Sequence, residues 1–188
     1  MTGIQERRFW QPGTRPSELS INSCRLALEA AEISPADVGA LIHGSVCRDF
    51  LEPATACTVH HHAGLPRDCF IFDVSNVCLG LLTGVAQAAN MIELGQIKAA
   101  LVVGSEGGRQ LVENTINTLN NDQTLTRKTI KSAVASLTIG SASCAFLLTH
   151  ESISKTKNRL VGAAVNANTA YHDCVRVITI KRELRWLR

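Results

Sequence analysis

One cysteine lies where the sequence changes from an extended segment to an apolar helix, and this position could carry nucleophilic chemistry. The apolar residues 70–72 are followed by residues 73–76, of which all but Val74 are polar, and a second apolar segment, residues 78–94, starts at Cys78. The first segment favours a strand, whereas the second has the length of a globular helix and is followed by Gly95, a common helix cap. A sharp turn between two such elements has the form of a nucleophile elbow, with cysteine in place of serine. We therefore predict that Cys78 is a nucleophile.

The thiol of Cys78 would meet the positive end of the helix dipole, which favours the thiolate form. A thiolate is a strong nucleophile and also a good leaving group, so it can accept an acyl group and pass it on. The backbone N–H of Cys78 could stabilise the oxyanion of that reaction. The alternative is a structural cysteine in the core, because buried cysteines are common.

Composition limits the class of protein. The 188 residues suffice for one domain or one half of a larger one, and 45% hydrophobic with only 4% aromatic residues predicts an aliphatic core. The net charge of +3 gives no reason to expect a nucleic-acid partner, and no apolar run reaches the roughly 20 residues of a membrane span. The seven cysteines form no CxxC pair, and the polar start lacks the pattern of a secretory signal. We expect free thiols and a cytoplasmic protein.

Alternating segments predict an α/β fold, with a mostly parallel mixed sheet, helices on both of its faces and a buried cysteine helix. Strands are expected at residues 38–46, 69–74, 99–103, 144–149 and 159–168. Helices are expected at residues 17–33, 52–63, 78–94 and 110–119. We expect one domain over residues 1–174, followed by a tail, residues 175–188, that carries five basic residues against one acid.

Several motifs occur together in the order of one known family. They are TGIQERR at residues 2–8, FDVSNVCLG around Cys78, AALVVGSE at residues 99–106 and a glycine-containing approach to the last strand at residues 137–144. This set resembles the β-ketoacyl-ACP synthase III enzymes of the thiolase superfamily, over about residues 2–173. The family's usual GDGAGA is weakened here to GSASCA. The stretch LEPATA at residues 51–56 is more particular, since it resembles the branch that joins two long acyl chains head to head in bacterial olefin biosynthesis.

The resemblance implies a thiolase-like half-fold and an acyltransferase. It implies a Claisen condensation of acyl thioesters through an acyl intermediate on Cys78, in fatty acid or long-chain hydrocarbon biosynthesis. It also implies a homodimer in which Glu52 acts as a base near the partner's cysteine. The substrates would be acyl-CoA or acyl-carrier protein, with no cofactor and no metal. The first strand, and the histidine and asparagine of the family's second half, have no counterpart here.

Other interpretations stay open for several residues. Glu52 could instead be an acid in the first turn of the helix over residues 52–63, with Pro53 at the first helical position. Arg7 and Arg8 could contact a phosphate of CoA or of a carrier protein, or be solvated loop charges. The consecutive histidines 60–62 point in different directions on a helix, so we do not expect them to share a metal ion.

The family enzyme is roughly twice as long as this chain. We therefore expect the chain to be the N-terminal half, and residues 175–188 to be a truncation or frameshift tail. On that basis the alternative function is an inert remnant, or a binding partner that keeps the fold without turnover.

Overall fold

The computed structural model describes residues 3–126 and 129–170. The chain divides into two units, residues 1–157 and residues 158–188. In the second unit, residues 158–170 are exposed and form no helix or strand, so the strand predicted at residues 159–168 is wrong. Its apolar side chains are exposed, Val161 by 97% and Val165 by 89%, and they pair with none of the four described strands. The predicted tail and the boundary at residue 174 lie outside the described residues.

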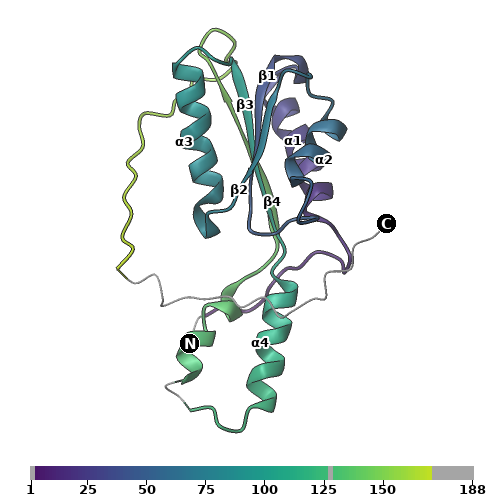
Figure 1. Cartoon of the computed structure of the whole chain (residues 1–188), viewed down its shortest axis with the longest axis vertical. Coiled ribbons are helices and arrows are strands. Elements are labelled where there is room, and N and C mark those ends of the chain that lie inside the picture. The colour runs from purple at the N-terminus through teal and green to yellow at the C-terminus, as the bar shows by residue number, and fades with distance from the viewer. Residues whose placement is uncertain (1–2, 127–128, 171–188) are drawn as a thin grey trace. The chain divides into compact units, whose positions relative to one another are not determined.

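A four-stranded sheet forms the centre of the first unit, in the order β2-β1-β3-β4 (Figure 1). The strands are β1 (Val38–Gly44), β2 (Phe70–Val74), β3 (Ala99–Glu106) and β4 (Ala142–Thr149). β1 pairs in parallel with both β2 and β3, whereas β4 pairs antiparallel with β3. The mostly parallel mixed sheet predicted from the sequence is confirmed.

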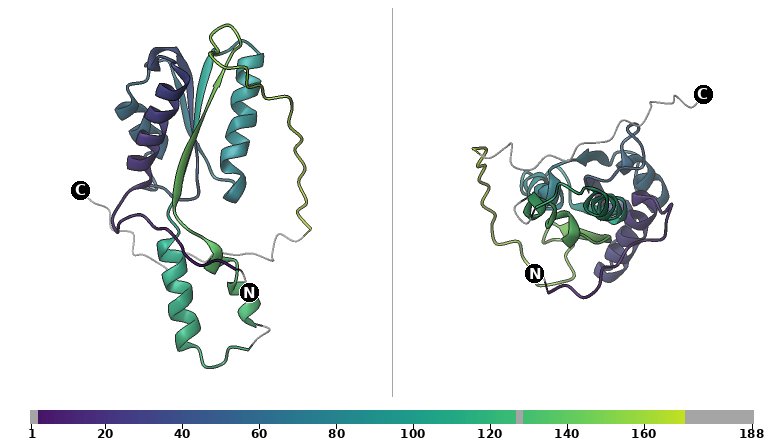
Figure 2. Two further views of the ribbon diagram at one scale, coloured as in Figure 1. Left: turned by 180° about the vertical axis from the view of Figure 1, so that it is seen from behind. Right: turned by 90° about the horizontal axis from the view of Figure 1, so that it is seen from below.

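Helices cover both faces of this sheet. α1 (Pro16–Ala31) and α2 (Thr55–Ala63) lie on one face, and α3 (Gly80–Glu93) lies on the other (Figures 1 and 2). α2 connects β1 to β2 and α3 connects β2 to β3, so the parallel pairs are joined by the expected crossovers. α4 (Arg109–Asn121) follows β3 and packs against a short 3₁₀ turn, Ser136–Thr138. None of the described helices combines the length and the hydrophobicity of a membrane span.

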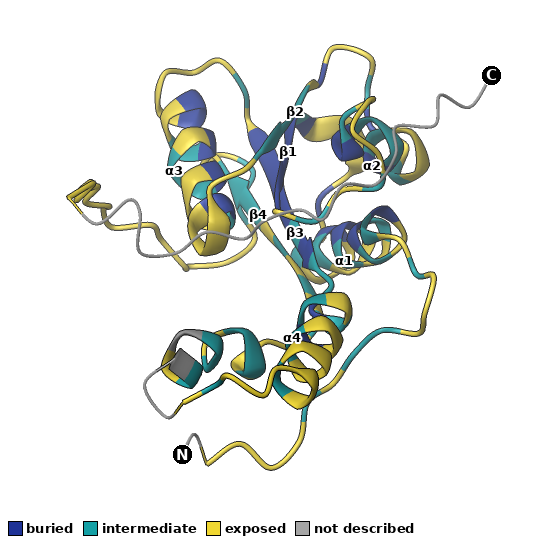
Figure 3. Ribbon diagram, turned by 60° about the horizontal axis from the view of Figure 1, so that its bottom comes forward, coloured by how far each residue is buried: buried dark blue, intermediate teal, exposed yellow. Residues whose placement is uncertain are grey.

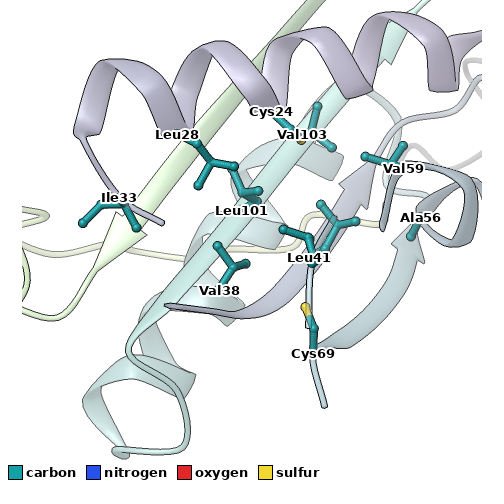
Figure 4. Close-up of a cluster of buried hydrophobic side chains, with 11 residues drawn as sticks. Cys24, Leu28, Ile33, Val38, Leu41, Ala56, Val59, Cys69, Leu101 and Val103 are labelled. Carbon is teal, nitrogen blue, oxygen red and sulfur yellow. The ribbon is translucent and has the colours of Figure 1, made fainter. Parts of the chain in front are cut away.

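The core has two parts because successive strand residues point to opposite faces. On the α1 and α2 side, Leu41 and Val103 pack with side chains from both helices, such as Cys24 and Val59 (Figure 4). On the α3 side, a second cluster contains Ala40, Ile42, Ala88, Met91, Ala100 and Val102. The central strands β1 and β3 are accordingly the most deeply buried part of the fold (Figure 3).

α3 is buried against the sheet on one side. Gly84, Ala88 and Met91 face the strands, and a Cβ on Gly84 would lie 2.6 Å from Val102 Cγ1. On the opposite side of the helix, Leu82 is 57% exposed. Among the described residues, the helix therefore buries its apolar side chains on the side that faces the sheet.

Candidate active site

Cys78 lies in a tight turn at the carboxyl end of the parallel strands. β2 ends at Val74, a single 3₁₀ turn covers Val77–Leu79, and α3 begins at Gly80. Val77 has a φ of 45°, which is rare for a β-branched residue and costs of order 1–3 kcal/mol. The Cys78 residue is exposed, so it is not a core cysteine. The sharp strand-to-helix turn expected from the sequence is present, and we call residues 75–79 the Cys78 turn.

Short-range hydrogen bonds hold the Cys78 turn. Leu79 N donates to Asn76 O at 2.8 Å, and Asn76 Nδ2 donates to Thr83 Oγ1 in α3 at 3.0 Å. In the described part of the chain the N–H of Cys78 has no acceptor. The hydrogen-bonding capacity of this N–H is therefore unused among the described residues.

Two glycines bring the start of α3 against the end of β1. A Cβ on Gly44 would lie 2.6 Å from both the carbonyl carbon and the oxygen of Gly80. A Cβ on Gly80 would in turn lie 3.1 Å from Gly44 C and 3.3 Å from Val74 O. This backbone-to-backbone contact fixes where α3 begins, and so fixes the place of Cys78.

Glu52 lies in the loop between β1 and α2, before the helix rather than inside it. α2 begins at Thr55, and Glu52 is exposed and followed by a cis peptide bond to Pro53. The interpretation of Glu52 as a first-turn acid with Pro53 at the first helical position is therefore wrong. Another acid takes the place at the helix start, because Asp73 Oδ2 accepts from Thr55 N at 2.8 Å and Asp73 Oδ1 accepts from Ala56 N at 2.9 Å.

The two candidate arginines have different surroundings. Arg7 is half-buried and its Nε donates to Leu137 O at 2.6 Å. Arg8 is exposed, while its carbonyl oxygen accepts from Ser141 N at 2.8 Å. Arg7 thus ties the N-terminal segment to residues 137–141, and Arg8 presents its guanidinium to solvent.

A buried histidine that the sequence analysis did not single out lies on the α1 and α2 side of the sheet. His43 Nε2 is 3.1 Å from Ser20 Oγ, and His43 Nδ1 is 4.0 Å from Asp73 Oδ1. Nδ1 has no hydrogen-bond partner among the described residues. Burial lowers the pKa of His43, against the opposing charges of Asp73, Asp49 and Glu106, so the ring is neutral near pH 7. A polar residue inside the apolar strand Val38–Gly44 was the available sequence signal.

This serine, histidine and aspartate arrangement is structural rather than hydrolytic. Ser20 and His43 are both 0% exposed, so no substrate reaches them. The hydrogen bonds continue from Ser20 Oγ to Ser105 Oγ at 2.6 Å, and from Ser105 Oγ to Ser143 Oγ at 2.7 Å. The network therefore cross-links α1, β1, β3 and β4.

The thiols differ in their fitness as nucleophiles. Burial raises the pKa of Cys24 to about 12 and those of Cys47 and Cys69 to about 11. Cys78 and Cys144 are exposed; Cys78 lies in the turn before α3, whereas Cys144 lies in β4. All six described cysteines are free, in line with the expected absence of disulfides among them.

The histidines of α2 form no metal site. His60 Nε2 is 2.9 Å from Pro66 O, which gives it a local structural partner. Within residues 3–126 and 129–170, no group of three histidine, cysteine, aspartate or glutamate side chains is arranged to hold a metal ion.

Comparisons with known proteins agree with this fold. A family model described as thiolase, N-terminal domain, matches residues 1–135. The acyl-CoA:acyl-CoA alkyltransferase of Shewanella oneidensis is 41% identical over 176 residues, which cover 92% of this chain and 50% of that protein. A β-ketoacyl-[acyl-carrier-protein] synthase III of Koribacter versatilis is 36% identical over 114 residues, 61% of this chain and 34% of that protein.

Solved structures of related proteins have a similar fold. The crystal structure of cerulenin-bound Xanthomonas campestris OleA superposes with a TM-score of 0.75 at 34% sequence identity, covering 80% of this chain and 44% of that chain. The chain spans about half the length of the two alkyltransferases that it matches, 50% of one and 52% of the other.

Proposed function

The chain belongs to the thiolase N-terminal domain family, and from this premise we propose that it carries the acyl-accepting cysteine of an enzyme that condenses two acyl thioesters. The single observation that supports the proposal most is that Cys78 is an exposed residue in a strained strand-to-helix turn. The relatives named acyl-CoA:acyl-CoA alkyltransferase and β-ketoacyl-[acyl-carrier-protein] synthase III point to the same class of reaction.

In the first step the Cys78 sulfur attacks the carbonyl carbon of an acyl thioester. The carbonyl oxygen becomes an oxyanion, to which the Cys78 N–H donates. The carbon–sulfur bond to the carrier then breaks, the carrier leaves as a thiolate, and the acyl group remains on Cys78. Cysteine suits this step because its thiolate is a good leaving group when the acyl group moves on.

In the second step Glu52 removes the α-proton of another acyl thioester. The resulting carbanion attacks the acyl carbonyl on Cys78, a carbon–carbon bond forms, and the cysteine thiolate is released with a β-ketoacyl thioester as product. We propose that Glu52 of one copy acts beside the Cys78 of a second copy in a homodimer. The exposed loop supports this assignment, since Glu52 makes no hydrogen bond or ion pair with described residues and Leu51 beside it is 78% exposed.

We propose acyl-CoA as the donor, because two relatives carry acyl-CoA in their names, with acyl-carrier protein as the alternative. Of the two arginines, exposed Arg8 is the better candidate for a carrier phosphate, with Arg7 supporting its segment. The proposed chemistry requires no cofactor, since a thiolate and a carboxylate supply both steps. A reducing cytoplasm would keep Cys78 as a free thiol.

Mass spectrometry of the purified chain tests the first step. Incubation with an acyl-CoA should add one acyl group per chain on Cys78 and release free CoA. Cys78→Ser should abolish this product, whereas Cys144→Ser, which removes the other described cysteine classed as exposed, should leave the rate unchanged. An unmodified wild-type chain, or acyl transfer to Cys144 at the same rate, would contradict the proposal.

Cross-linking tests the placement of Glu52. Under mild oxidation, a Glu52→Cys chain should form a disulfide between its introduced thiol and Cys78 of a second copy, identified by peptide mapping. Glu18→Cys introduces a thiol on α1 and serves as the matched control that should not cross-link to Cys78. Failure of the Glu52→Cys chain to form that cross-link would remove Glu52 from the proposal.

A further inference from the structure

Asp73 connects two segments that the proposed function needs together. It lies in β2 with its side chain 8% exposed, and it faces α2. Its two carboxylate oxygens accept from the N–H groups of Thr55 and Ala56, 18 and 17 residues earlier in the chain. Hydrogen bonds to a carboxylate are among the stronger ones in proteins, and the start of a helix favours negative charge. Asp73 therefore caps α2 from a separate element.

The local sequence offers α2 no cap of its own. Ala54 is in the N-cap position, where serine, threonine, aspartate or asparagine would normally accept from the helix. Without Asp73 the N–H groups of Thr55 and Ala56, both residues nearly fully buried, would lack an acceptor. The position of α2 thus depends on the side chain from β2.

The Glu52 loop, residues 45–54, is held by carboxylates at both of its ends. At its start, Glu106 of β3 accepts from Val46 N at 2.6 Å and from Cys47 N at 3.2 Å. At its end, Asp73 holds the residues that follow Ala54. Glu52 lies three residues before Thr55, which Asp73 contacts. A movement of Thr55 would therefore also move Glu52.

Asp73 is also connected to the proposed nucleophile, through the chain that follows it. β2 ends one residue after Asp73, at Val74, and continues into the Cys78 turn. His43 is paired in register with Asp73, and its buried ring packs 4.0 Å from the carboxylate. This packing and the strand pairing leave Asp73 little freedom, so it is a fixed point from which both segments extend.

We infer that Asp73 is a positioning residue. By capping the start of α2, it fixes where the Glu52 loop lies relative to the Cys78 turn. This inference rests on the proposed function of Cys78 and Glu52. Asp73 is nearly buried and both of its oxygens are engaged, so it acts through these segments and does not contact substrate itself.

Hydrogen–deuterium exchange of the whole chain tests the anchoring. Asp73→Asn keeps the shape but retains only one oxygen acceptor, so the amides of Thr55 and Ala56 and those of the Glu52 loop should exchange at least about tenfold faster. Asp68→Asn changes an exposed acid just before the same strand and should leave this exchange unchanged. Unchanged exchange in Asp73→Asn would overturn the inference.

A second change distinguishes positioning from general damage. Ala54→Ser supplies a local N-cap, so adding it to Asp73→Asn should restore slow exchange in α2. If Asp73→Asn alone fails to fold, recovery of the fold by Ala54→Ser supports the inference, and failure of the double variant to fold or to regain protection overturns it.

The Glu52→Cys cross-link supplies the functional readout. In that background Asp73→Asn should slow cross-linking to the second copy's Cys78 by at least about fivefold, and Ala54→Ser should restore the rate. Alkylation of Cys78 by iodoacetamide should remain within about twofold throughout, since a small reagent does not require the Glu52 loop. An unchanged cross-linking rate would overturn the inference. By contrast, a wild-type chain that takes no acyl group on Cys78 would overturn the proposed function, whatever the behaviour of Asp73.

Discussion

The contact between Gly44 and Gly80 makes a strong prediction about Cys78. In Gly44→Ala the new Cβ would lie 2.6 Å from two backbone atoms of Gly80, where ordinary contacts are about 3.4–4.0 Å. Backbone atoms cannot rotate away as a side chain can, so the start of α3 must move by about 1 Å. We expect a loss of about 1–3 kcal/mol in the free energy of unfolding. Acylation of Cys78 should slow by about 10- to 100-fold, because a displacement of this size costs a reaction up to about a hundredfold.

Gly39→Ala is the matched control on the same strand. Its Cβ would lie 2.6 Å from Ile97 Cγ2, a side-chain atom at the opposite end of β1 from Cys78. This variant should lower stability without slowing acylation by more than about twofold. The assay compares thermal unfolding with the rate of acyl transfer from acyl-CoA by intact mass. A Gly44→Ala chain that is destabilised but acylates at the wild-type rate would refute the claim that this contact positions Cys78.

Three further predictions concern buried groups. Burial lowers the pKa of His43 in the folded protein below its unfolded value of about 6.5. The neutral ring therefore contributes its full stability above about pH 6.5. Below that pH the free energy of unfolding should fall, by up to about 1.4 kcal/mol per pH unit. Urea midpoints at pH 7.5 and 5.5 should show this fall, and an equal fall in His43→Gln would contradict it. Ser105→Ala should lower the free energy of unfolding by about 1–3 kcal/mol, since it breaks two hydrogen bonds of the buried Ser105 hydroxyl, and an unchanged urea midpoint would argue against the serine network. At pH 8, iodoacetamide should label exposed Cys144 well before Cys47 and Cys69, whose pKa values are about 11, and comparable peptide labelling would be inconsistent with their burial.

Features that depend on neighbouring residues could be predicted from the sequence. The order of strands and helices follows from hydrophobic periodicity, and the turn before α3 follows from an apolar run that stops at Asp73 and resumes at Cys78. The motifs around Cys78 and Glu52 also identified the family that the comparisons support. These signals are local in the chain, so a sequence displays them directly.

Features that depend on distant residues could not be predicted in the same way. The start of α2 was placed three residues early, because Pro53 suggested a helix start and the true cap, Asp73, comes from another strand. The network of Ser20, His43, Ser105 and Ser143 joins four elements, and nothing in the spacing of serines indicates such contacts. The strand expected at residues 159–168 was wrong because composition indicates extended backbone but not whether a partner edge is present.

Peptide mapping after incubation with an acyl-CoA tests the central claim most directly. One acyl group per chain should be found on the peptide that contains Cys78, and hydroxylamine should release it as expected for a thioester. Acyl groups spread over several cysteines, or none on Cys78 in a folded chain, would contradict the account.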